Sequence, residues 1–100
     1  MRTIEIDAGP CTSVKAFCTL LKAEIRALPG HGDSIEAFVD SMVWGTMSEL
    51  APPYLIRVRG LSGGPIAAFI RDLSEALGQA RLDYRARRGE DVEVVIRLRR

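Results

Sequence analysis

The stretch Leu28–Gly45, LPGHGDSIEAFVDSMVWG, decides how the rest of this chain is arranged. Pro29 and Gly30 predict the end of one helix, and Asp33 or Ser34 is the N-cap with which the next helix begins. The apolar residues of this second helix recur at helical spacing, and they are Ile35, Phe38, Val39, Met42 and Val43. We therefore expect a short helix that buries one face.

The other side of the same helix is acidic. At 100° per residue, Asp33, Glu36 and Asp40 lie on one side, with Ala37 and Trp44 beside them. The helix dipole favours carboxylates in the first turn, which accounts for Asp33 and Glu36 but not for Asp40. Like charges four residues apart mildly destabilise a helix, so the pair Glu36 and Asp40 is compatible with a binding face. The alternative is a solvated acidic surface without a partner.

Length and composition indicate one domain that spans residues 1–100, with 47% apolar residues. No run of 18 apolar residues occurs, so we expect no membrane span. The N-terminal segment MRTIEIDAGP lacks the apolar region of a secretory signal, so a cytoplasmic location is expected. Cys11 and Cys18 are expected to be reduced rather than bridged.

Periodicity and turn residues predict six elements: strand 3–7, helix 14–28, helix 35–44, strand 54–59, helix 65–88 and strand 92–98. Residues 46–50 could add one more turn, and Gly78 could split the long helix. Strands separated by helices pair in parallel with right-handed connections. The prediction is an α/β fold of order β-α-α-β-α-β, in which three or four helices cover the faces of a three-stranded parallel sheet.

A family resemblance is carried by four segments: SVKAFCTLLKAEIRALPGHG, LPGHGDSIEAFVDSM, PYLIRVR and GEDVEVVIRL. With these segments the chain resembles the barstar family, small intracellular inhibitors of a secreted, barnase-like bacterial ribonuclease. The similarity covers most of the chain and implies a single barstar-like domain.

The resemblance also implies roles for individual residues. In that family a Leu-Pro pair and a glycine precede a helix with two acids four residues apart, and Glu36 and Asp40 match those acids. They would enter the nuclease active site. The remaining implied contacts are Trp44 at an often aromatic position, His31 in the loop where the family has tyrosines, and Glu75, beside the position reached by counting back from Gly89. With Asp33 and Ala37 these residues make up the expected partner-binding set.

The implied function is that of an immunity protein, which binds a basic extracellular ribonuclease in a 1:1 complex and is a monomer when free. No enzyme activity is expected, because His31 is the only histidine and no nucleophile accompanies it. Neither a metal nor another cofactor is expected, since one histidine and two scattered cysteines do not supply the clustered ligands of a metal site.

Two alternatives stay open. Residues 81–100 contain seven arginines against four acids, and six of these arginines could form a nucleic-acid-binding patch: Arg85, Arg87, Arg88, Arg97, Arg99 and Arg100. The chain could also be a barstar-like interaction domain whose partner is not a nuclease.

Overall fold

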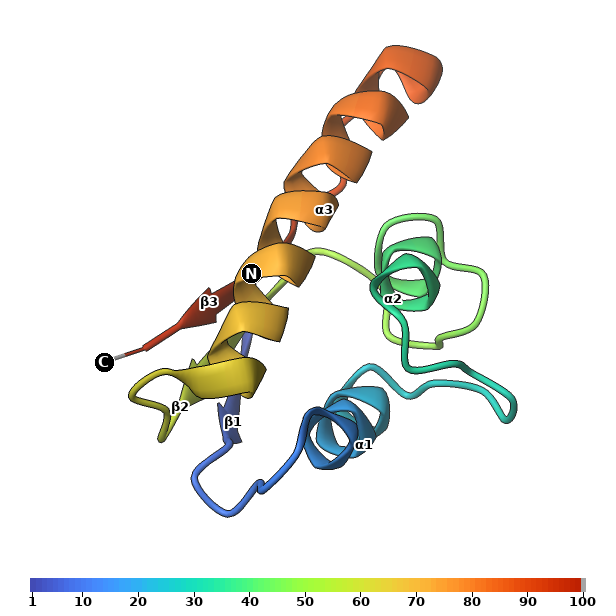
Figure 1. The fold of residues 1–100 in the computed structure, drawn as a ribbon. Helices are drawn as coiled ribbons and strands as arrows, with labels where there is room; N and C mark the ends of the chain where they lie inside the picture. Colours follow the sequence, from blue (N-terminus) through green and yellow to red (C-terminus); the bar gives the residue numbers. More distant parts are fainter. Residues whose placement is uncertain (100) are drawn as a thin grey trace.

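Three strands and three helices follow one another in the computed structural model, which describes residues 1–99 (Figure 1). They are β1 (Arg2–Asp7), α1 (Val14–Glu24), α2 (Ile35–Met42), β2 (Tyr54–Arg59), α3 (Gly64–Arg88) and β3 (Val94–Leu98). Both strand pairs are parallel, in the order β1-β2-β3. The predicted α/β fold with a three-stranded parallel sheet is therefore confirmed. Arg100 lies outside the described residues.

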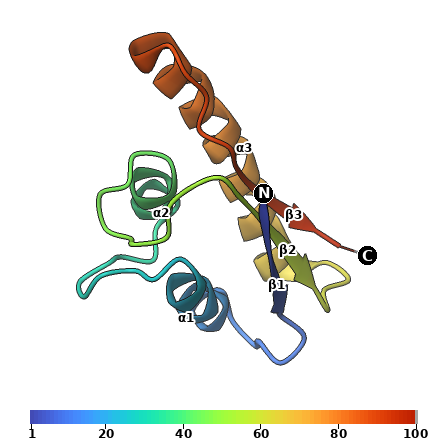
Figure 2. The same ribbon diagram turned by 180° about the vertical axis from the view of Figure 1, so that it is seen from behind.

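Only one face of the sheet is covered. Buried and exposed residues alternate along β2, where Tyr54, Ile56 and Val58 are buried while Arg57 and Arg59 are exposed. Figure 2 shows the three strands lying in front of α3, with no helix over this side of them. Right-handed connections that step in one direction across a sheet place all their helices on the same face. The expectation that helices cover the sheet's faces is thus wrong for the second face.

The long helix α3 forms the main wall of the core. Its buried residues include Ile66, Ile70, Leu73 and Leu77, and Gly78 does not interrupt it. The C-terminal part of α3 extends past the sheet, and α2 lies beside its middle (Figure 1). This packing creates the surface between α2 and α3 that is described below.

The connections around α2 differ from the prediction. α1 ends at Glu24 rather than near residue 28, because the chain then pairs with residues 47–50. The N–H of Leu28 donates to the carbonyl of Met47 (2.8 Å), and the N–H of Leu50 donates to the carbonyl of Ile25 (3.2 Å). The optional helical turn over 46–50 is therefore absent, and the two segments that flank α2 are tied to each other.

Three smaller observations complete the fold. α2 ends at Met42 and β3 begins at Val94, each two residues inside the predicted element. Cys11 is half-buried, Cys18 is buried, and both are free thiols. Within the described part of the chain, no helix is both long and apolar enough to cross a membrane.

Candidate functional site

A groove with a volume of about 310 Å³ lies between α2 and α3. Nine residues line it, and we call it the acidic groove: Ile35, Glu36, Val39, Asp40, Trp44, Ala76, Gln79, Ala80 and Asp83. Apolar side chains from both helices alternate with three carboxylates. A surface of this kind can accept a positively charged group that also has an apolar part.

The start of α2 sets the direction of its two carboxylates. Ser34 is the N-cap with an extended backbone, and its hydroxyl accepts a hydrogen bond from the N–H of Ala37 (3.1 Å). Phe38 and Met42 are buried on the core side of the helix. Glu36 and Asp40, four residues apart, consequently share the exposed side.

The carboxylates of the groove are available to a partner. Glu36, Asp40 and Asp83 are all exposed. Among residues 1–99, none of the three takes part in an ion pair. Within residues 1–99, the one side-chain hydrogen bond of Asp83 is a long one of 3.5 Å, which Nε2 of Gln79 donates. The groove therefore presents three negative charges that are not neutralised within its lining.

Trp44 lines the groove and packs against side chains of α3. Its ring lies 5.0 Å from that of Tyr84, measured between centroids, with a tilt of 51°. The guanidinium carbon of Arg87 lies 5.8 Å from the centre of the Trp44 ring, and that of Arg88 lies 5.7 Å from Tyr84. The predicted position of Trp44 beside Glu36 and Asp40 is what the structure shows.

Asp33 does not belong to this surface, contrary to the prediction. Its carboxylate lies 2.6 Å from Nζ of Lys22 on α1. Asp33 precedes the N-cap Ser34, so the 100° spacing that holds within α2 does not extend to it. Its carbonyl accepts a weak hydrogen bond from the thiol of Cys18 (3.7 Å). The pKa of Cys18 is raised to about 11, mainly by burial and also by the charge of Asp33, whereas the charge of Lys22 opposes both effects.

His31 and Ala37 also lie outside the acidic groove. Nδ1 of His31 is 2.6 Å from the carbonyl oxygen of Gly32, and its ring lies 4.9 Å from that of Phe38. Ala37 is half-buried, and its methyl group faces Gly32. Both residues support the loop before α2 and do not line the groove with Glu36 and Asp40.

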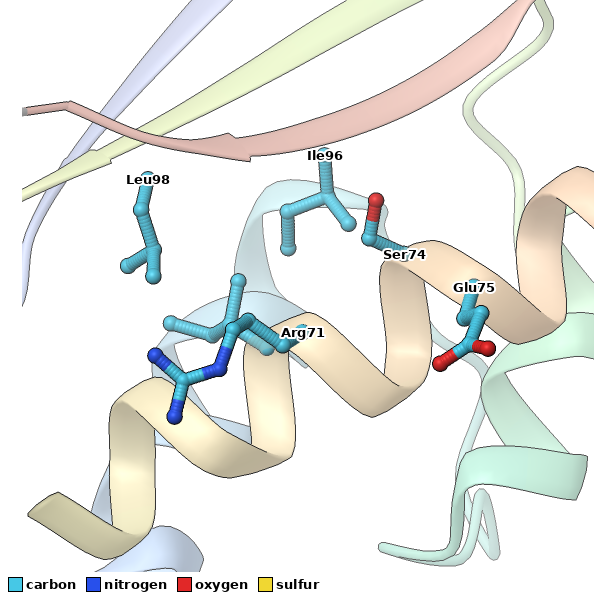
Figure 3. A pocket seen from close by; sticks show the side chains of 6 residues that line it. Arg71, Ser74, Glu75, Ile96 and Leu98 are labelled. Carbon is cyan, nitrogen blue, oxygen red and sulfur yellow. The ribbon is translucent and has the colours of Figure 1, made fainter.

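Glu75 lies in a different hollow. It lines a cavity of about 290 Å³ between α3 and β3, together with Arg71 and Ser74 of the same helix. Figure 3 shows Ile96 and Leu98 extending from β3 towards this part of α3.

The acid that α3 contributes to the acidic groove is Asp83, which sequence reasoning missed. Ala76, Ala80 and Asp83 are spaced i, i+4 and i+7. That spacing puts Asp83 on the same side of α3 as Ala76 and Ala80, but nothing in the sequence indicates that this side faces α2.

No protein-family model and no curated protein sequence matches this chain. In residues 1–99, no three side chains of histidine, cysteine, aspartate or glutamate come together as a metal site. The site is accordingly interpreted from the geometry of the acidic groove.

Proposed function

We propose that this chain is a barstar-like inhibitor, which binds a basic extracellular ribonuclease in a 1:1 complex and covers its active site. One observation carries the proposal: Glu36, Asp40 and Asp83 are exposed on two packed helices and form no ion pair within residues 1–99. Carboxylates that lack internal partners can pair with the cations of another molecule.

The inhibition rests on mimicry of RNA. The active site of a ribonuclease is a positively charged cleft that accepts phosphates, so rigidly held carboxylates can take the place of the phosphates. Opposite potentials on the two proteins speed their association. Charge pairs that lose their water in the interface, together with an aromatic anchor such as Trp44, slow dissociation.

The cytoplasm is the location that fits this function. An inhibitor that stays in the cell protects cellular RNA from a nuclease that is synthesised there before it is secreted. The proposed role is therefore that of an immunity protein, and it requires neither a cofactor nor catalytic activity of this chain.

A titration of RNA cleavage tests the proposal. Increasing amounts of the chain are added to a purified barnase-type ribonuclease, and cleavage is expected to cease at a 1:1 ratio. The double variant Glu36→Lys, Asp40→Lys is expected to inhibit at least 100-fold more weakly. The control is Asp72→Lys, Glu75→Lys, which changes the net charge equally but lies outside the acidic groove.

Two results would count against the proposal. If the wild-type chain left the ribonuclease fully active, a partner other than a nuclease would be favoured. If the control variant lost as much inhibition as the double variant, net charge rather than the acidic groove would be responsible.

A further inference from the structure

The uncovered face of the sheet carries an excess of arginines. Side chains at alternate positions of the three strands point to this side, and three of them are Arg57, Arg59 and Arg97. Arg99 directly follows β3, and its N–H donates to the carbonyl of Val58. We call these four arginines the basic sheet face. All four are exposed. The acids on this side are Glu5 and Asp7 of the edge strand β1.

Stability explains only part of this charge arrangement, namely the register pairs that Arg57 and Arg59 form with Glu5 and Asp7 of β1. Arg57 and Arg97 are direct register partners on neighbouring strands. Like charges directly opposite each other destabilise a sheet. Glu5 lies 3.5 Å from both Arg57 and Arg99, so one carboxylate serves two guanidinium groups.

The remaining contacts leave this surface positively charged. Asp7 lies 3.9 Å from Arg59. Arg97 takes part in none of the ion pairs formed by residues 1–99. Exposed pairs of this length contribute little to stability, so the arginines remain able to bind another anion.

The positive surface continues around the edge of β3. A hollow of about 410 Å³ adjoins Arg99 and is lined also by Ser62, Gly63 and Arg71. Arg71 is exposed and, within the described residues, forms no ion pair. A fifth guanidinium group thus borders the basic sheet face.

We propose that the basic sheet face binds the phosphate backbone of single-stranded RNA. Neighbouring strands place arginines about 4.8 Å apart, and alternate residues of one strand place them about 6.6 Å apart. The planar guanidinium group forms two parallel hydrogen bonds to a phosphate. This grid can hold successive phosphates of a flexible strand.

An acidic protein surface fits this face less well. Tight protein interfaces depend on buried aromatic anchors, and the residues at positions 3, 5, 7, 55, 57, 59, 95, 97 and 99 include no aromatic residue. Binding of the RNA phosphate backbone needs no such anchor. Because this face has no aromatic side chains, the RNA bases do not stack on the protein. Binding is therefore independent of RNA sequence and sensitive to salt. The proposal does not rest on the acidic groove, which is formed by different elements.

Fluorescence anisotropy with a labelled 20-nucleotide oligouridine tests this proposal between 20 and 200 mM KCl. The wild-type chain is expected to bind, with affinity falling steeply as salt rises. The variant Arg97→Gln, Arg99→Gln is expected to bind at least 10-fold more weakly at 50 mM KCl. Its plot of log affinity against log salt is expected to be shallower by about 1.4, since each lost phosphate contact contributes about 0.7.

The matched control is Arg85→Gln, Arg88→Gln, which removes the same charge from the end of α3 and is expected to bind within twofold of wild type. Thermal melting verifies that all variants are folded. Absence of wild-type binding at 20 mM KCl overturns the proposal, as does an equal loss in the control. Competition by polyglutamate as effective as by unlabelled RNA would point to an acidic protein partner and would also overturn it. None of these results bears on ribonuclease inhibition.

Discussion

Replacing Trp44 with alanine is expected to loosen the contact between the end of α2 and the part of α3 that extends past the sheet. Trp44 is half-buried, packs on Tyr84 at 5.0 Å and lies beneath Arg87 at 5.8 Å. The aromatic pair contributes about 0.5–1.5 kcal/mol beyond its burial. The cation–π contact adds about 0.5–1 kcal/mol. With the apolar surface that is lost, the free energy of unfolding is expected to fall by about 2–4 kcal/mol.

Urea unfolding at 25 °C measures this change. Trp44 is the only tryptophan, so the transition is followed by circular dichroism at 222 nm rather than by fluorescence. The variants Trp44→Ala, Tyr84→Ala and their combination form a double-mutant cycle, whose coupling energy is expected to be about 0.5–1.5 kcal/mol. Leu82→Ala is the control, because Leu82 is 61% exposed on the same helix and its loss is expected to change stability by less than about 0.5 kcal/mol.

The reasoning is refuted if the coupling energy between positions 44 and 84 is below about 0.3 kcal/mol, the level at which distant residues are additive. The contact between Trp44 and Tyr84 would then not be what fixes the position of the segment after α2 against α3.

Three further predictions concern other parts of the molecule. Asp83→Ala is expected to weaken ribonuclease binding by at least about 1 kcal/mol, while Glu75→Ala leaves it unchanged, because only Asp83 lines the acidic groove. Calorimetric titration measures both affinities. A loss in Glu75→Ala but not in Asp83→Ala would support Glu75, the acid predicted from the sequence. Cys18 has a pKa of about 11 in the folded chain against 9.0 in the unfolded one, so the unfolded state binds fewer protons above pH 9. Stability is therefore expected to fall by about 1 kcal/mol from pH 8 to pH 10, and an equal fall in Cys18→Ala would exclude this thiol as the cause. Gly60→Ala is expected to destabilise by about 2–4 kcal/mol, because φ is 87° and a Cβ there would lie 2.6 Å from a backbone nitrogen after β1. Gly30→Ala is the control, because Gly30 has a similar φ of 89° but no atom lies within 4 Å of the added Cβ. Its free energy of unfolding, measured by thermal or urea unfolding, is expected to fall by about 1 kcal/mol. If the two variants lost the same stability, the close contact at Gly60 would be excluded as a cause.

The predicted elements agree best with the structure where local patterns decide. β2 occupies Tyr54–Arg59 as expected, because Pro53 precedes it, Gly60 follows it and its residues alternate between core and solvent. The same reasoning failed after α1, where the helical stripe was read through to residue 28. The pairing of residues 25–28 with 47–50 is made by segments distant in sequence, and periodicity carries no information about it.

In the candidate site, too, the sequence predicted which residues share one helix but not which helices pack together. Glu36 and Asp40 could be placed together because both belong to one helix. Asp83 could not be placed with them, since that requires knowing how α2 packs on α3. The six arginines grouped by sequence are also divided, because Arg97 belongs to β3 while Arg85 lies on α3. Arg57 joins Arg97 only through the pairing of β2 with β3.

The central claim is that the exposed carboxylates of the acidic groove bind the cations of a ribonuclease. Calorimetric titration of a barnase-type ribonuclease with Asp40→Ala, beside wild type, tests it most directly. We predict a loss of about 2–5 kcal/mol in binding, the usual cost of truncating one partner of a buried charge pair, with the free energy of unfolding nearly unchanged. This corresponds to an affinity about 30- to 5,000-fold weaker. Equal affinities of the variant and the wild-type chain would contradict the account.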